Sequence, residues 1–326
     1  MSSFLRSLGS FLSGSESTIP TIEELSKPKP KEAEHGEVSI DQIPPNELLV
    51  NEEGCEGCSG EECEHQQYPS YLDFDTQSPL LGSMVPYGRH FMISTAQCDW
   101  PAHIEEDYGT LAANLQALLV SNPMPWRTFV TNTSLVPKYS SVIRCGLDVI
   151  ILPDNIIVGD VTPDDAQLLY DVFVKMPLPT SNEPIHIEAA FRNYNLGNLT
   201  IYPNPYDSMI LICSHRKRDK RCGVTAPILN REFDHVLREL DIPDGEGGCG
   251  VFMVSHVGGH KFAGNVICYI NKGRTGIWYG RVKTCHCREI IEETIINKKV
   301  IKELYRGSMS HSFGEPTLSK CNRIKW

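Results

Sequence analysis

The stretch SHVGGHKFAGNVICY, residues 255–269, places His256 and His260 four positions apart around a pair of glycines, directly before an apolar run. A second stretch, CSHRKRDKRCG, begins at Cys213 and reaches Cys222 after eight intervening residues. Each stretch follows an apolar segment that is typical of a buried strand. The sequence therefore predicts two loops at strand ends that carry four soft or borderline ligands, which is the composition of a candidate metal site.

The last third of the chain, residues 205–326, has a β-α-β-β-β-α order of predicted elements. Its expected strands are SMILIC, CGVFMVSH, FAGNVICYI and GIWYGRV, and its expected helices are TAPILNREFDHVLREL and REIIEETIINKKVIKELY. The helical segments repeat apolar residues at spacings of three and four, whereas the strands are continuous apolar runs. This order predicts an α/β fold in which a compact sheet is flanked by helices, as in a thioredoxin-like domain.

Two further regions precede that domain. Residues 67–204 alternate strands (HFMIST, WRTFVTNTSL, DVIILP) with helices (IEEDYGTLAANLQALLV, TPDDAQLLYDVFVKM), which predicts an N-terminal α/β domain; a degenerate thioredoxin-like fold is one form of it. Residues 1–66 hold 14 acidic and 4 basic residues and show no apolar period, so we expect a disordered acidic tail there. The chain is thus predicted to have two domains C-terminal to this tail.

Composition limits the compartment. No apolar run approaches the roughly 18 residues that cross a bilayer, and no apolar h-region with a cleavage site is evident at the N-terminus. Twelve cysteines in such a chain are more often metal-binding or redox-active than disulfide-bonded. We therefore expect a soluble protein of a reducing compartment, in the cytoplasm and also the nucleus, and favour both over mitochondria although MSSFLRSLGSFLSGS weakly resembles a presequence.

The spacing of the candidate ligands bears on which metal they hold. A structural zinc site usually takes its cysteines from a tight turn with two to four intervening residues, and the gap between Cys213 and Cys222 is longer. A 2Fe-2S cluster is larger than one ion and tolerates longer loops. Histidines in place of one cysteine pair raise its reduction potential. Gly258 and Gly259 fit a close approach of backbone to such a cluster, because glycine lacks a Cβ.

Three stretches together resemble the sucrase/ferredoxin-like family: ICSHRKRDKRCGVTAP, SHVGGHKFAGNV and WYGRV. The resemblance is dense over residues 209–282 and looser over HFMISTAQCDW and LDVIILP. It implies a thioredoxin-like ferredoxin domain that binds one 2Fe-2S cluster, with Cys213 and Cys222 on one iron and His256 and His260 on the other. No carboxylate pair in the sequence identifies itself as the acid and nucleophile of a glycosidase, so we expect no sucrase activity.

This ligand set predicts an electron-transfer protein rather than an enzyme. Two neutral imidazoles leave the oxidised cluster without net charge, and each keeps a second nitrogen, so we expect proton uptake to accompany one-electron reduction. Oxidative or xenobiotic stress is the expected setting. Two alternatives stay open: an oxidoreductase with its own substrate, and a zinc-stabilised protein-interaction module.

The expected partners follow from charge and from the resemblance. The basic run at residues 216–221 favours an acidic electron donor or acceptor, although it could equally dock the acidic first domain. The terminal Trp326 resembles the tails by which the cytosolic iron–sulfur assembly machinery recognises some clients, but Lys325 stands where an acidic residue is expected. We expect no nucleic-acid or membrane partner.

Several other cysteines have no firm assignment. The stretch CEGCSGEECEH in the acidic tail is either a second metal or regulatory thiol site or a set of free thiols, and Cys98 would be reactive if a helix N-terminus followed it. Cys285 and Cys287 could bind a metal only if another ligand were brought to them. The cysteines of the tail stretch are Cys55, Cys58 and Cys63.

Overall fold

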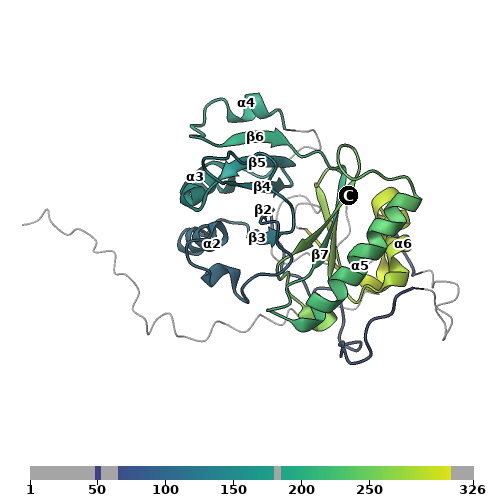
Figure 1. Ribbon diagram of the computed structural model, residues 1–326. Helices are drawn as coiled ribbons and strands as arrows, with labels where there is room; N and C mark the ends of the chain where they lie inside the picture. Colours follow the sequence, from purple (N-terminus) through teal and green to yellow (C-terminus); the bar gives the residue numbers. More distant parts are fainter. Residues whose placement is uncertain (1–47, 53–64, 180–184, 310–326) are drawn as a thin grey trace, which may run out of the picture. The chain divides into compact units, whose positions relative to one another are not determined.

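The computed structural model describes residues 48–52, 65–179 and 185–309, all of which belong to one compact unit. Its main feature is a mixed sheet of ten strands (Figure 1). From one edge to the other these are β12 (Tyr305–Ser308), β10 (Thr275–Tyr279), β9 (Val266–Ile270), β7 (Ser208–Cys213), β8 (Cys249–Val254), β3 (Thr128–Thr133), β2 (Arg89–Ser94), β4 (Leu147–Leu152), β5 (Ile156–Val161) and β6 (Thr200–Pro203). The predicted α/β class is confirmed. A parallel pair, β1 (Leu49–Val50) and β11 (Val300–Ile301), lies outside this sheet.

The two halves of the sheet repeat one arrangement. In the C-terminal half, β7 pairs parallel with β8 and antiparallel with β9, and β9 pairs antiparallel with β10. In the N-terminal half, β2 pairs parallel with β3 and antiparallel with β4, and β4 pairs antiparallel with β5. Each parallel pair is joined through a helix, as parallel strands require. Both halves thus have the strand order of a thioredoxin-like sheet.

The halves meet where β3 pairs antiparallel with β8, at Thr133 and Val254. The expected boundary between residues 204 and 205 falls in the connection from β6 to β7. Because the sheet runs across this boundary without a break, the halves share backbone hydrogen bonds rather than only a side-chain interface. That each half is an independent domain stays a prediction.

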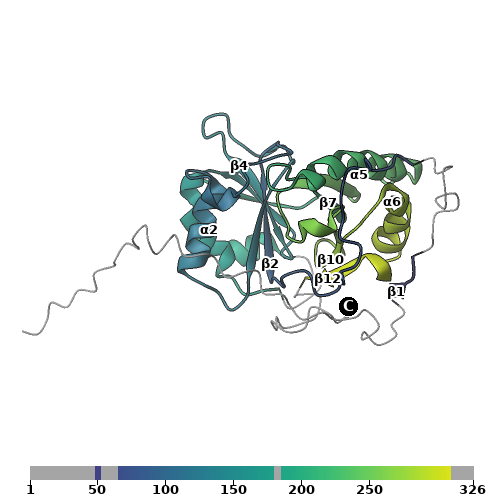
Figure 2. The ribbon, with the colours of Figure 1, turned by 90° about the horizontal axis from the view of Figure 1, so that it is seen from below.

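Helix α5 (Lys220–Glu239) crosses from β7 to β8 and packs beside α6 (Cys287–Glu289), as Figures 1 and 2 show. The sequence predicts its start at residue 225, but the side chain of Asp219 accepts from the backbone N–H of Arg221 and caps the helix five residues earlier. The apolar face that the sequence predicts is buried: Leu229, Phe233 and Leu237 lie in the core.

Helix α2 (Leu111–Ser121) crosses from β2 to β3 and is shorter than the sequence predicts. The segment from residue 104 forms only the 3-10 turn η2 (Ile104–Glu106), because Gly109 takes φ +83° and Thr110 then caps α2. The remaining helical elements are short: η3 (Pro163–Asp165), α3 (Ala166–Leu169), the π-helical η4 (Tyr170–Val174), α4 (Ile187–Phe191), η5 (His260–Phe262), η6 (Thr284–His286), the π-helical η7 (Ile290–Ile296) and η8 (Lys302–Leu304).

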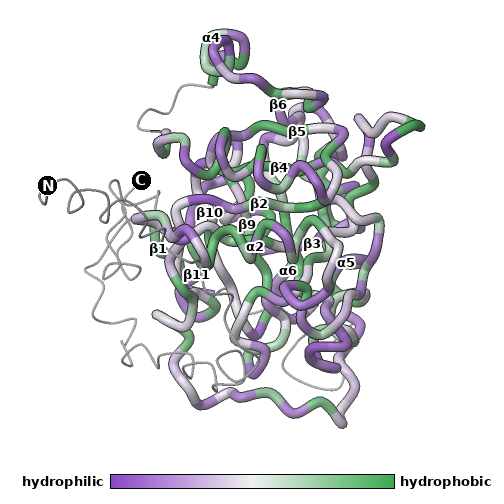
Figure 3. The backbone as a smooth tube through the Cα atoms, turned by 90° about the vertical axis from the view of Figure 1, so that its left-hand side faces the viewer, coloured by the Kyte–Doolittle hydropathy of each residue, from purple (hydrophilic) through white to green (hydrophobic). Residues whose placement is uncertain are grey.

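Strands β7 and β9 consist almost entirely of apolar residues, and Figure 3 shows hydrophobic segments in green within the sheet. All six residues of β7 and all five of β9 are buried, because helices cover one face of this half and packed side chains cover the other. Strands buried on both faces read as continuous apolar runs rather than alternating ones. The ends of these rigid strands are therefore well-defined positions from which to present ligands.

Candidate metal centre

Cys213 and Cys222 come together at the end of the parallel pair. Cys213 is the last residue of β7, and Cys222 lies in the first turn of α5 rather than in a loop as the sequence predicts. Both side chains are 1% exposed. The Cys222 thiol, and after it His256 and the backbone N–H of Val257, hold the pKa of Cys213 well below its usual range despite burial. This shift favours the thiolate of Cys213, which is the form that binds metal.

The histidine loop, residues 255–260, connects β8 to η5. Gly258 and Gly259 have φ values of +88° and +65°, a left-handed conformation that L-residues adopt only with strain. This turn brings the rings of His256 and His260 to 5.5 Å between centroids. The Nδ1 atoms of both rings are buried, and that of His256 makes no hydrogen bond among the described residues. A buried ring nitrogen of this kind calls for a ligand.

The four candidate ligands can be compared with the geometry of a single-ion site. In a tetrahedral zinc site, bonds of 2.0–2.3 Å place the ligand atoms within about 4 Å of one another. Among the described residues, however, the group of His, Cys, Asp or Glu with three ligand atoms within 4.8 Å is His103, Glu105 and Glu106, and none of the four candidates belongs to it. The described structure therefore does not bring three of the four candidate ligand atoms within the reach of one ion.

His215 ties the histidine loop to the N-terminal half, a role that sequence reasoning missed. Its ring is 1% exposed; Nδ1 accepts the backbone N–H of His256 at 3.0 Å, and Nε2 lies 2.9 Å from the carbonyls of both Trp100 and Pro101. Since Nδ1 accepts, the proton is assigned to Nε2, which donates to these carbonyls. The only signal in the sequence is its place two residues after Cys213.

The loop between the cysteines docks partly on its own chain. Arg218 donates to His103 and to the carbonyl of Ala102, and Arg221 donates to the carbonyl of Asp73. The three remaining basic side chains are exposed. We call them the basic patch: Arg216, Lys217 and Lys220.

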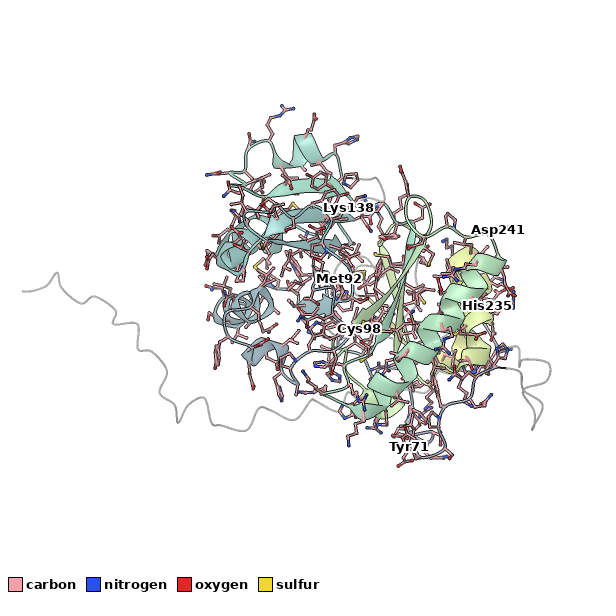
Figure 4. The ribbon with its side chains drawn as sticks, in the orientation of Figure 1. Tyr71, Met92, Cys98, Lys138, His235 and Asp241 are labelled. Atoms are coloured by element: carbon pink, nitrogen blue, oxygen red, sulfur yellow. The ribbon has the colours of Figure 1, made fainter. Side chains whose placement is uncertain are left out.

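Of the other cysteines that the sequence analysis names, Cys98, Cys285 and Cys287 belong to the described residues. Cys98 is exposed, and the helix α2 that follows it begins only at Leu111, so no helix N-terminus lies directly after Cys98 in the chain. It is labelled in Figure 4, and its carbonyl accepts from the Ser214 hydroxyl at 2.7 Å. Cys287 is buried, which raises its pKa, and Cys285 is half-buried beside it. Trp326 and the cysteines of the tail stretch lie outside the described residues.

The structure defines an α/β protein with a thioredoxin-like sheet, and two cysteines and two histidines make up its candidate site. The chain belongs to the sucrase/ferredoxin-like family, whose model matches residues 80–307. No solved structure matches the chain. No helix of the described residues is both long enough and apolar enough to cross a membrane.

Two yeast proteins are similar over most of the chain. Actin patches distal protein 1 of Saccharomyces cerevisiae is 32% identical over 76% of this chain and 81% of its own length. Altered inheritance of mitochondria protein 32 of Debaryomyces hansenii is 29% identical over 74% of this chain and 90% of its own length. A protein of the latter name from Clavispora lusitaniae is 46% identical over 31% of this chain and 35% of its own length.

Proposed function

We propose that the chain is an electron-transfer protein that holds one 2Fe-2S cluster, with Cys213 and Cys222 on one iron and His256 and His260 on the other. The observation that carries this proposal is the pairing of two buried thiols, one with a strongly lowered pKa, with two histidines whose Nδ1 atoms are buried. When bound, the cluster supplies a site for one-electron reduction and oxidation.

The protein's own residues prepare the site for such a group. The Cys222 thiol and, after it, the backbone N–H of Val257 stabilise negative charge on Cys213, which favours its thiolate. The two cysteines lie in an apolar cluster with Met209, Leu211 and Val257, which excludes water. Each histidine keeps a second ring nitrogen, and proton uptake on reduction, measured as a pH-dependent midpoint potential, remains part of the proposal.

The basic patch supports an acidic redox partner as part of the same proposal. Its three side chains lie between the two cysteine ligands and face solvent. A cluster of like charges at the surface steers an oppositely charged protein toward the site and loses this effect as salt increases. A cytoplasmic location, a role in oxidative or xenobiotic stress and recognition of Trp326 by the assembly machinery belong to the proposal as well.

One observation favours the second candidate, an oxidoreductase with its own substrate. A cavity of about 390 Å³ is lined by Ala263, which ends the turn that His260 begins, and by Arg281, Phe74 and Tyr68. Cavities of this size accept small organic molecules. Turnover with a chemical reductant and a panel of small acceptors would favour the enzyme. Rapid reduction and reoxidation of the cluster without turnover would favour the electron carrier.

The direct test is anaerobic purification followed by a visible spectrum and analysis of iron, sulfide and zinc. We expect red-brown protein with two irons and two sulfides per chain, and a shifted spectrum in His256→Cys. The matched control is His235→Cys, which changes an exposed histidine on α5 and should leave the spectrum unchanged. Colourless protein with one zinc per chain would contradict the proposal and favour a zinc-stabilised interaction module.

A further inference from the structure

A buried arginine lies against the histidine loop from strand β12. Arg306 is fully buried, and its Nη1 donates to the carbonyl of Gly258 at 3.2 Å and to Oδ1 of Asn265 at 2.7 Å. On its other side, Nε donates to Oγ of Ser83 at 2.9 Å and Nη2 donates to the Ser83 carbonyl at 2.8 Å. The planar guanidinium is thus held on both sides and fixes the direction of the Gly258 peptide.

Asn265 joins this arginine to both ligand loops. Its side-chain Nδ2 donates to the carbonyl of Gly259 at 3.0 Å, while its backbone carbonyl accepts the backbone N–H of Cys213 at 3.0 Å. The side chain is 1% exposed, so these bonds are made away from water. One residue therefore contacts the turn between the two histidines and the backbone of the first cysteine.

The contact between the turn and the arginine is close. A Cβ on Gly259 would lie 2.2 Å from Nη2 of Arg306, so the position accepts no side chain unless the guanidinium moves. The guanidinium also lies over the rings of Trp278 and Phe262, at 5.6 and 5.7 Å from their centroids. Such stacking holds the arginine plane in one orientation.

We propose that Arg306 and Asn265 are positioning residues that fix the turn at Gly258 and Gly259, and so set how His256 and His260 are presented. They hold two consecutive carbonyls of the turn, which leaves its peptide planes little freedom. The inference rests on the proposed function only in one respect, namely that the group bound by the two histidines is a 2Fe-2S cluster. Order in the turn itself is a property of the polypeptide and can be measured without a metal.

The test compares Arg306→Lys and Asn265→Ala with Arg89→Lys. Lysine keeps the charge of Arg306 but loses the planar fork. Arg89 is a matched control, since it is also fully buried and donates to backbone carbonyls, but it pairs with Asp154 in the N-terminal half. The measurements are amide hydrogen exchange of residues 257–261 in the metal-free full chain, and the EPR spectrum and midpoint potential of the iron-loaded chain.

We expect exchange in the loop to be about tenfold faster in Arg306→Lys and Asn265→Ala, with an altered EPR spectrum and midpoint potential in both. Arg89→Lys should lose thermal stability and leave these readouts as in the wild type. Unchanged exchange and EPR in Asn265→Ala would overturn the inference, even if Arg306→Lys did not fold. Absence of iron in the wild type would contradict the proposed function alone, because exchange would still decide whether these residues order the turn.

Discussion

Replacing His215 tests how the two halves of the chain are joined at the site. His215→Phe fills a similar volume but removes the acceptor of the His256 backbone N–H and the donor to the carbonyls of Trp100 and Pro101. A buried donor or acceptor left without a partner costs about 1–3 kcal/mol. The His256 N–H loses its acceptor, and the two carbonyls lose the one N–H that they share. We therefore expect a loss of about 2–4 kcal/mol in the free energy of unfolding.

His215→Asn separates the two contacts. The amide oxygen of asparagine can take the place of Nδ1 and accept the His256 N–H, but the side chain is too short to reach the carbonyls that Nε2 contacts. We therefore expect about half the loss that phenylalanine causes. Urea unfolding of the full chain, followed by circular dichroism, measures both variants. Wild-type stability in His215→Phe, or an equal loss in both variants, would refute this account of the contact.

Three further predictions concern charge and thiols. Burial opposes a charge on His286, but the Cys285 thiol and the Glu52 carboxylate outweigh it and raise its pKa to about 9. Because this pKa lies above that of the unfolded chain, the charged His286 stabilises the fold fully below about pH 6.5. This stabilisation is lost as the pH rises through about 9, by at most about 3 kcal/mol. In urea unfolding, the free energy of unfolding of His286→Gln should decline less than that of the wild type over this range. Charge reversal of the basic patch should slow electron exchange with an acidic partner at low salt and leave the rate at high salt unchanged. Stopped-flow kinetics measures both rates. A low-salt rate equal to that of the wild type would exclude the patch as a docking surface. Cys213→Ser should abolish iron retention. Cys249→Ser changes an equally buried thiol in β8 and should retain the metal. Metal analysis that found iron in both variants would remove Cys213 from the ligand set.

Much of the C-terminal half could be predicted from local pattern. The run SMILIC coincides with β7, because a strand buried on both faces is apolar throughout. The start of α5 was missed, since residues 220–224 have no apolar period and the helix begins instead at the cap that Asp219 supplies. In the N-terminal half, β5 and β6 were not predicted.

The four candidate ligands could be identified from residue type and spacing, but the residues that hold their loops could not. His215, Asn265 and Arg306 are polar residues that periodicity does not single out, and each has a partner far away in the sequence. The pairing of β3 with β8 likewise joins segments about 120 residues apart. Contacts of this kind depend on the packed fold, which periodicity and spacing do not contain.

The central claim is that two cysteines bind one iron of the cluster and two histidines bind the other. Pulsed EPR of the reduced protein tests this claim most directly. The chain would be produced with ¹⁵N-labelled histidine, loaded with iron and sulfide, and reduced with dithionite. The account predicts two strongly coupled histidine nitrogens in the wild type and one in His260→Cys. A paramagnetic cluster without histidine coupling in the wild type would contradict it.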